Sequence, residues 1–309
     1  MAVYVNTNYS ALQGQRYLGN VQNSLTTTYQ RLSSGMRINS AKDDAAGLQI
    51  ADRLTSQING LNQGNRNASD GIALAQTVES GMDEISGMPQ KIRTLAVQAS
   101  NGTNTAEDKA ALSKEASALA NEITRIANQT TFAGKQILVG QQENTNTIFS
   151  KATGQDKSKA GTMTLQVGSN KGDTISFTIE NMKFSVVGKR ADGNFATGND
   201  KLVNVANGAL AFQFSKIDPS DAISLMDKMI ADVDGQRANL GAIQNRLESS
   251  IRNQSNVAAN EADARSRIRD ADFAEESANL SQQSIIQQAA ASMLMQANTR
   301  PQLGLSLLG

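Results

Sequence analysis

The feature that most constrains the fold of this chain is the spacing of its apolar residues. Near both ends of the chain, apolar residues recur in alternating steps of three and four positions. This spacing aligns apolar side chains along one face of a helix and is typical of helices that pack lengthwise against each other. The first such stripe consists of Leu18, Val21, Leu25, Thr28 and Leu32. It predicts a mainly α-helical protein built from long helices.

The same apolar spacing recurs in four later stretches, and each of them is predicted to form a helix. Glycine residues and Pro89 weaken the first of these helices without ending it. Thr105 and Asp108 have the spacing of a capping box, whose side chains bind the free amides at a helix start, so the next helix begins there. Pro301 and a short apolar tail follow the last helix. The predicted helices span residues 54–99, 105–128, 226–268 and 272–297.

The middle of the chain, about residues 140–215, is different in kind, because it holds six of the eight Phe together with many Gly, Asn and Thr. Residues 163–167 and 174–179 alternate between apolar and polar, and the turn sequence GSNKGD joins them, which predicts a β-hairpin. Helical runs flank this region on both sides. We therefore predict a long antiparallel helical bundle or coiled coil formed by the N- and C-terminal segments, with a small middle insertion that contains the hairpin.

The charge and the residue inventory exclude several function classes. Acidic and basic residues number 29 each, so no net field attracts nucleic acid. The chain has no His and no Cys, which removes Ser-His-Asp and Cys-His catalysis and the usual ligands of zinc, copper and iron. Asp43 and Asp44 would point about 100° apart on a helix, unlike a catalytic pair. We predict no enzymatic activity, no cofactor, no metal and no nucleic-acid partner.

The N-terminal sequence MAVYVNTNYS has neither the basic leader nor the apolar core of a secretory signal, and no apolar stretch is long enough to span a bilayer. These features predict no membrane insertion and, by default, a soluble cytosolic chain. That default fails if the chain is exported by a route that reads no cleavable signal.

Each terminal run contains little besides one apolar stripe, and too little chain lies nearby to cover it. Isolated helices are marginal in water, so the terminal helices need a partner. All four Tyr lie near the N-terminus, where a ring with a polar tip suits a contact that is partly apolar and partly wet, although packing within the chain is an alternative. The candidate assembly residues are Leu12, Leu18, Val21, Leu25, Leu32, Leu280, Ile285, Ile286, Met293, Leu303, Leu305, Leu307 and Leu308.

Several motifs, in the same order along the chain, make the sequence resemble bacterial flagellin. They are VNTNYSAL, LSSGMRINSAKDDAAGLQIADRL, NQTTFAGKQIL, GQRANLGAIQNRLESSI, SRIRDADFAEE and QANTRPQLGLSLL. They occupy about residues 1–140 and 220–309, and LQVGSNKGDTISF resembles the hairpin of that family. The resemblance implies a subunit that assembles with itself into the helical flagellar filament used for swimming, outside the cell and without a cleavable signal peptide.

The resemblance also implies three layers in the filament. The terminal helices would form an inner layer, disordered in the monomer and ordered in the filament, inside a helical shell and a short outward-facing segment. These layers comprise residues 1–40 with 270–309, residues 41–185 with 216–269 including the hairpin near 163–180, and residues 186–215.

Further partners are implied by the resemblance alone. The chain would be exported unfolded through the flagellar type III apparatus, with an export chaperone on residues 270–309, and would meet the flagellar cap, hook-associated junction proteins and other flagellins. The segment PQKIRTLAVQ resembles one that a vertebrate flagellin-sensing Toll-like receptor recognises, and Lys91, Leu95 and Glu115 lie at the matching positions. Lys91 stands where arginine is usual, and lysine lacks the bidentate fork of arginine.

The stretch LSSGMRINSAKDDAAGLQIADRL joins the first two helices, and residues 33–35 are predicted to form a flexible joint. Ser40 and Asp43 have the spacing of a capping box, and Asp43 and Asp44 carry the negative charge that a helix start favours. The candidates for capping or for contacts between subunits are Arg37, Ser40, Lys42, Asp43 and Asp44.

Other proteins share parts of this pattern. The junction protein between hook and filament has the same terminal architecture, and a type III translocator would need a strongly apolar hairpin that this sequence lacks. The match over both ends of the chain favours flagellin.

Overall fold

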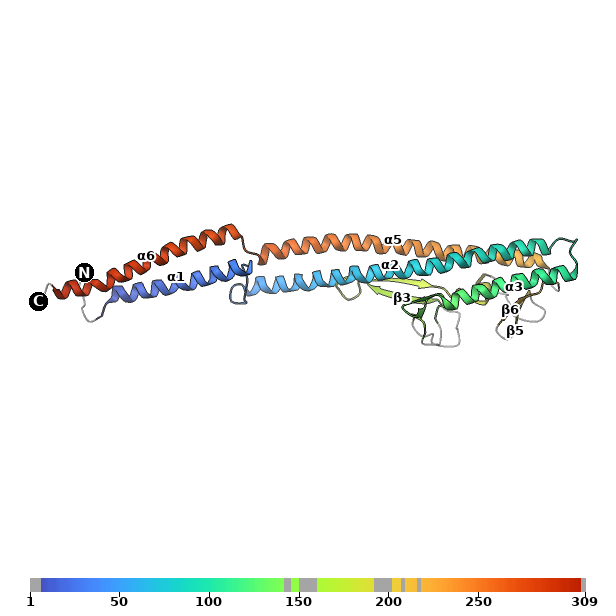
Figure 1. The fold of residues 1–309 in the computed structure, drawn as a ribbon, viewed down its shortest axis with the longest axis horizontal. Helices are drawn as coiled ribbons and strands as arrows, with labels where there is room; N and C mark the ends of the chain where they lie inside the picture. Colours follow the sequence, from blue (N-terminus) through green and yellow to red (C-terminus); the bar gives the residue numbers. More distant parts are fainter. Residues whose placement is uncertain are drawn as a thin grey trace. The chain divides into compact units, whose positions relative to one another are not determined.

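The computed structural model shows long helices and short antiparallel strand pairs, which confirms the mainly α-helical fold (Figure 1). It describes residues 7–141, 146–149, 160–191, 202–206, 209–215 and 218–306. The helices are α1 (Tyr9–Ser34), α2 (Ala45–Ala99), α3 (Ala106–Gln129), α4 (Phe184–Ala191), α5 (Pro219–Arg269) and α6 (Phe273–Ser306). The strands are β1 (Thr131–Phe132), β2 (Lys135–Gln136), β3 (Gly161–Gln166), β4 (Thr174–Ile179), β5 (Val203–Ala206) and β6 (Ala209–Phe212).

Two units divide the chain. We call them the terminal unit, which comprises Met1–Asn59 and Val257–Gly309, and the central unit, which comprises Gly60–Asn256. The helices α1 and α6 belong to the terminal unit, whereas α2 and α5 contribute to both.

In the terminal unit, α1 and α6 pack along each other in opposite directions (Figure 1). Val21 and Leu25 lie in the seam between them and are only 8% and 6% exposed. The stripe predicted for the first helix therefore meets a helix from the other end of the chain. The polar contacts that join the two helices pair Asn8 with Ala297, Thr28 with Gln283, and Arg31 with Glu276.

The last helix passes through Pro301 and ends at Ser306, whereas the sequence predicted an end near Ala297. Proline has no N–H, so the carbonyl of Ala297, four residues earlier, lacks its usual helical donor. The Asn8 side chain takes that place, because its Nδ2 donates to the Ala297 carbonyl at 2.8 Å. The Oδ1 of the same side chain accepts from the Ala11 N–H at 3.0 Å and caps α1. One asparagine thus satisfies backbone groups of both terminal helices.

The central unit has a continuous apolar core to which α2, α3, α4, α5 and the β-hairpins contribute. Within it, α2 and α5 run antiparallel, since Asp83 pairs with Arg237 at 2.9 Å and Asn65 donates to Ser255 at 3.3 Å. Large side chains that are less than 2% exposed include Leu74, Met82, Ile85, Ile92, Ile123, Ile179, Met182, Phe184 and Phe214.

The predicted capping box at the start of α3 is confirmed. The Asp108 N–H donates to the Thr105 hydroxyl at 3.2 Å, and the Thr105 N–H donates to the Asp108 carboxylate at 2.9 Å. The hydroxyl and the backbone N–H of Thr105 hold the pKa of the Asp108 carboxyl below its usual value. The helix therefore begins where the sequence places its start.

The predicted hairpin is confirmed as β3 and β4, which pair antiparallel with Leu165 opposite Ile175. It lies against α2, where the Asn67 side chain donates to the Gln166 carbonyl at 2.8 Å. The approach is closest at Gly64, because a Cβ atom there would lie 1.9 Å from the Val167 carbonyl oxygen. Glycine at position 64 is thus required by the seating of the hairpin.

A second hairpin, β5 and β6, was not predicted from the sequence. Its outer edge is bound by polar side chains spaced four residues apart on α3. The Phe214 N–H donates to the Ser113 hydroxyl at 3.0 Å, the Phe212 N–H donates to the Ser117 hydroxyl at 2.8 Å, and the Leu210 N–H donates to the Asn121 side chain at 2.9 Å. These side chains satisfy strand-edge groups that a neighbouring strand would otherwise bind.

Candidate assembly surface of the terminal helices

The terminal helices expose a set of large apolar and aromatic side chains. A few exposed apolar residues are normal on a protein surface, but a dense set on one helix pair indicates a surface that another molecule covers. The exposed fractions are 73% for Tyr9, 50% for Leu12, 53% for Tyr17, 58% for Tyr29, 63% for Phe273, 67% for Ile285, 68% for Met293 and 66% for Met295.

The structure divides the predicted assembly residues whose side chains it describes into three groups. Val21 and Leu25 fill the seam between α1 and α6, whereas Leu12, Ile285 and Met293 are exposed. The half-buried members are Leu18, Leu32, Leu280 and Ile286. The remaining candidates, Leu303, Leu305, Leu307 and Leu308, have side chains outside the described part of the chain. The stripe read from the sequence thus combines seam residues with outward-facing ones, because helix spacing alone does not say which neighbour covers a side chain.

A groove of about 540 Å³ follows the seam between the two helices. Tyr17 and Met293 line it together with the small residues Gly14, Ala290 and Ala297. A Cβ atom at position 14 would lie 3.3 Å from Leu294 Cδ1, so the glycine permits a close approach of the helices. Sequence reasoning did not predict this groove, although the small residues on both helices signal close packing.

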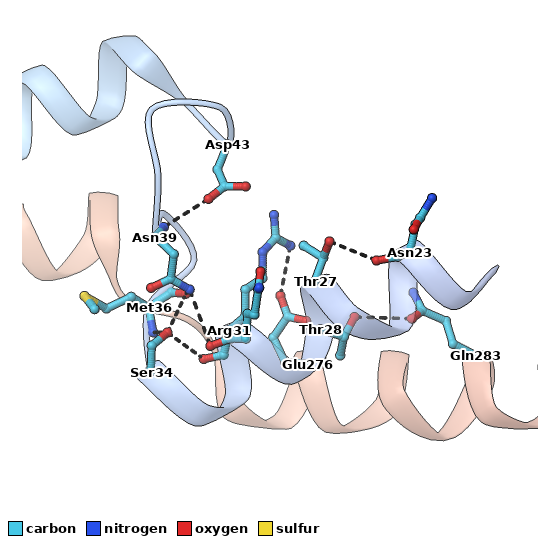
Figure 2. Close-up of polar contacts among 11 residues, drawn as sticks. Asn23, Thr27, Thr28, Arg31, Ser34, Met36, Asn39, Asp43, Glu276 and Gln283 are labelled. Carbon is cyan, nitrogen blue, oxygen red and sulfur yellow. Dashed lines mark hydrogen bonds and ion pairs between the residues drawn. The ribbon is translucent and has the colours of Figure 1, made fainter. Parts of the chain in front are cut away.

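Polar contacts of Thr28 and Arg31 join α1 to α6 near the C-terminal end of α1 (Figure 2). Arg31 Nη1 lies 3.1 Å from Glu276 Oε1, and the Thr28 hydroxyl donates to Gln283 Oε1 at 3.3 Å. Glu276 is only 7% exposed, and its second carboxylate oxygen and Arg31 Nε have no hydrogen-bond partner among the described atoms. Loss of the Arg31 charge would leave the buried Glu276 carboxylate without its partner, which is strongly destabilising, whereas Arg31 itself is partly exposed.

The helices α1 and α5 both end close to these contacts. Gly35 ends α1 with a left-handed φ of 68°, which glycine adopts without strain. The Arg37 N–H donates to the Arg269 carbonyl at 2.7 Å, and the Ala271 N–H donates to the Gly35 carbonyl at 3.0 Å. Within the terminal unit, the two breaks in helical structure are therefore bonded to each other.

The predicted cap at Ser40 is wrong, because this residue belongs to a turn that precedes the helix. The Asp43 carboxylate accepts from the Ser40 N–H at 2.9 Å, from the Ser40 hydroxyl at 3.0 Å and from the Asn39 N–H at 3.1 Å (Figure 2 draws the last of these). These bonds, chiefly those from Ser40, hold the pKa of the Asp43 carboxyl below its usual value. The Ser40 hydroxyl is directed at this carboxylate and not at a helix amide.

Asp44 is the residue that caps α2. Its carboxylate accepts from the Gly47 N–H at 2.9 Å, and the helix begins at the next residue, Ala45. Arg37 and Lys42 are exposed nearby, and the Arg37 guanidinium donates to the Ile268 carbonyl at 3.0 Å. The predicted cluster thus serves local structure through Asp43 and Asp44, and it presents Lys42 at the surface.

The three residues matched to receptor recognition lie in the central unit. Lys91 on α2 and Glu115 on α3 are exposed, whereas Leu95 is half-buried and packs against the core. In the part of the chain that the structure describes, no group of acidic residues could hold a metal ion. Across the same residues, no helix combines the length and apolar character that crossing a membrane requires.

Comparisons with known proteins match both ends of the chain. The bacterial flagellin N-terminal helical region matches residues 5–143, and the bacterial flagellin C-terminal helical region matches residues 223–308. Polar flagellin C of Vibrio parahaemolyticus serotype O3:K6 and flagellin B of Vibrio cholerae serotype O1 are each 35% identical to this chain, with all of both chains covered.

Among solved structures, a putative flagellar hook-associated protein from Vibrio parahaemolyticus has a similar fold. Its TM-score is 0.54 at 16% sequence identity, and the match covers 74% of this chain and all of that one. Flagellins are structural proteins of the flagellar filament and not enzymes. Two regional matches that together span more than half of the chain, and relatives 35% identical over its full length, show that this protein belongs to the bacterial flagellin family.

Proposed function

We propose that this flagellin assembles with copies of itself through the exposed faces of α1 and α6, which become the innermost layer of a helical filament. The observation that supports this most directly is the row of exposed apolar side chains on both helices, from Tyr9 to Tyr29 and from Phe273 to Met295. Covering such side chains stabilises an interface by roughly 25 cal/mol per Å² of apolar area. Neighbouring copies of the same helix pair would supply that cover.

Seeded polymerisation tests this surface. We expect Ile285→Gln to raise the critical concentration for filament growth by about tenfold or more, because an exposed apolar anchor becomes a polar side chain inside the contact. Val97→Gln is the matched control, since Val97 is 49% exposed but lies in the central unit. Equal polymerisation of the Ile285 variant and wild type, measured by sedimentation, would contradict the proposal.

The layers of the filament form part of the same proposal. Residues 1–40 with 270–309 would form the inner layer and gain full order on assembly, residues 41–185 with 216–269 the shell, and residues 186–215 the outward segment. Limited proteolysis of the monomer is expected to remove both ends and leave the central unit intact. If both ends of the monomer resist the protease, the proposal that they gain order only on assembly is contradicted.

Export and partners are proposed from family membership. The chain would pass unfolded through the flagellar type III apparatus, bound beforehand by a chaperone on residues 270–309, and would end outside the cell in contact with the cap and the junction proteins. The absence of Cys agrees with this route, because no disulfide has to be avoided or broken during passage. Co-purification of the monomer with its chaperone, lost when residues 270–309 are deleted, is the expected result.

A role as hook–filament junction protein is the alternative within the same architecture. A junction protein forms a ring of limited size, whereas a flagellin elongates without limit from a seed. Electron microscopy of the seeded reaction separates the two, since long filaments are expected here and short closed rings would favour the alternative.

Recognition by the vertebrate flagellin-sensing Toll-like receptor would involve Lys91, Leu95 and Glu115. The exposed positions of Lys91 and Glu115 are compatible with a contact between side chains and a receptor. Lysine offers a point charge where arginine would offer two parallel donors, so Lys91→Arg is expected to strengthen the response of receptor-bearing cells. If the cells respond equally to Lys91→Arg and to wild type, position 91 does not contribute to recognition by the receptor.

A further inference from the structure

Methionine is the only sulfur-containing residue type in this chain, which has ten Met and no Cys. The side chains of Met293 and Met295 are 68% and 66% exposed. The thioether of methionine is oxidised to a sulfoxide where an oxidant reaches it, so exposure decides which residues react. Four other methionines are at most 1% exposed, namely Met82, Met182, Met226 and Met229.

The two exposed thioethers flank a residue of the helix seam. Leu294 packs on α1 at Gly14, where a Cβ atom would lie 3.3 Å from Leu294 Cδ1. Successive residues of a helix point about 100° apart, so Met293 and Met295 leave the seam on opposite sides. Met293 also lines the groove beside Tyr17. Both flanks of the helix pair therefore carry an oxidisable side chain at the same level.

We propose that Met293 and Met295 form an oxidation site that controls whether a free chain can assemble. The proposal rests on the proposed function, in which these flanks are covered by neighbouring copies. The oxidant is a peroxide or another two-electron oxidant of that class. With hydrogen peroxide, a sulfur lone pair attacks one oxygen, the O–O bond breaks, and the second oxygen leaves as water after proton transfer. Sulfur loses two electrons, which the peroxide gains, and the product is the sulfoxide.

The sulfoxide changes the surface that has to be buried. A flexible apolar side chain becomes a polar and chiral one, and burial of a polar group without a hydrogen-bond partner is unfavourable. The free chain would thus lose its capacity to join the polymer. Once assembled, the same thioethers would be covered and protected, so the order of oxidation and assembly determines the outcome.

The test treats the purified full chain with hydrogen peroxide, either as monomer or after seeded growth into filaments. Peptide mass spectrometry measures each methionine, and sedimentation measures assembly. In the monomer, Met293 and Met295 are expected to oxidise at least about fivefold faster than the buried methionines, because accessibility limits the reaction. The oxidised monomer is expected to need about tenfold more protein to assemble. In filaments, oxidation of both residues should slow severalfold.

Two variants and a rescue assign the effect. The double variant Met293→Leu/Met295→Leu cannot be oxidised at these positions, so its assembly is expected to change less than twofold on peroxide treatment, whatever its untreated level. Met88→Leu removes a half-buried methionine of the central unit and should leave the sensitivity at the wild-type level. Methionine sulfoxide reductase with a dithiol reductant should restore assembly of the oxidised wild type as these two sulfoxides disappear.

Normal assembly of the oxidised wild type would overturn the proposal, as would full peroxide sensitivity of the double leucine variant. Recovery of assembly while both sulfoxides persist would overturn it as well. Failure of untreated wild type to assemble on seeds would instead refute the proposed function, so the two failures are distinguishable.

Discussion

At the scale of single residues, side chains that complete backbone hydrogen bonding at helix ends carry much of the specificity of this fold. Thr105 and Asp108 open α3, Asp44 opens α2, and Asn8 serves both terminal helices. An unmade hydrogen bond at a helix end is costly, because the exposed amides and carbonyls there have no partner within the helix.

Asn8→Ala is expected to weaken the terminal helix pair by about 1–2 kcal/mol, through loss of the cap on Ala11 and of the donor to the Ala297 carbonyl. The thermal depolymerisation midpoint of filaments would fall accordingly. Asn23→Ala is the matched control, since Asn23 lies exposed on the same helix and should change stability by less than about 0.5 kcal/mol. Equal midpoints for the two variants would deny Asn8 its double role.

The Asp108 carboxyl makes the stability of α3 depend on pH. Its pKa is lowered in the folded state, so the contribution to stability is present above the unfolded pKa of about 3.9 and is lost as the pH falls through the lower folded value. Wild type is therefore expected to be more stable than Asp108→Asn near neutral pH, with the difference shrinking below about pH 4. Chemical denaturation at a series of pH values measures this, and a difference independent of pH would contradict it.

At the scale of elements, apolar periodicity predicted the long helices and alternation predicted the hairpin β3–β4. The start at Thr105 was predicted correctly because both members of the capping box are local in sequence. The cap at Ser40 was predicted wrongly, since an Asp-Asp pair offers two carboxylates and only three-dimensional structure shows that Asp43 turns back while Asp44 begins the helix. The hairpin β5–β6 escaped prediction because its edge is satisfied by α3, far away in sequence.

The seating of hairpin β3–β4 on α2 gives an element-scale prediction. Gly64→Ala would bring a methyl group against the Val167 carbonyl and displace the hairpin, which is expected to cost about 1–3 kcal/mol of unfolding free energy. Gly87→Ala is the control in the same helix, because no described atom beyond the neighbouring helix backbone lies within 4 Å of its added Cβ. That change should stabilise by about 0.5–1 kcal/mol through helix propensity. If denaturant unfolding shows that both variants change the free energy of unfolding in the same direction, this account is contradicted.

At the scale of the whole molecule, the family and the mainly helical fold were predicted from motifs and periodicity, and both are confirmed. The assembly surface was predicted less completely. Val21 and Leu25 share the spacing of outward-facing residues but lie in the seam, while Phe273 and Met295 were not among the candidates and are exposed. Which face of a terminal helix is covered depends on a partner helix from the other end of the chain.

Removal of residues 303–309 is expected to leave the helix content of the central unit unchanged and to impair assembly. The deleted segment carries the candidate assembly residues at the end of the chain, and it belongs to the terminal unit. Circular dichroism checks the first expectation and seeded polymerisation the second. Filaments that grow normally from the truncated chain would show that this tail is dispensable.

The double use of Asn8 has a consequence for how the sequence can vary. Pro301 lacks the amide that would bond the Ala297 carbonyl, and the Asn8 side chain from the opposite end of the chain donates to that carbonyl instead. We expect the two positions to covary among homologous sequences, with loss of the proline relaxing the demand for an amide at position 8. Two positions 293 residues apart in the sequence would thus change together during evolution.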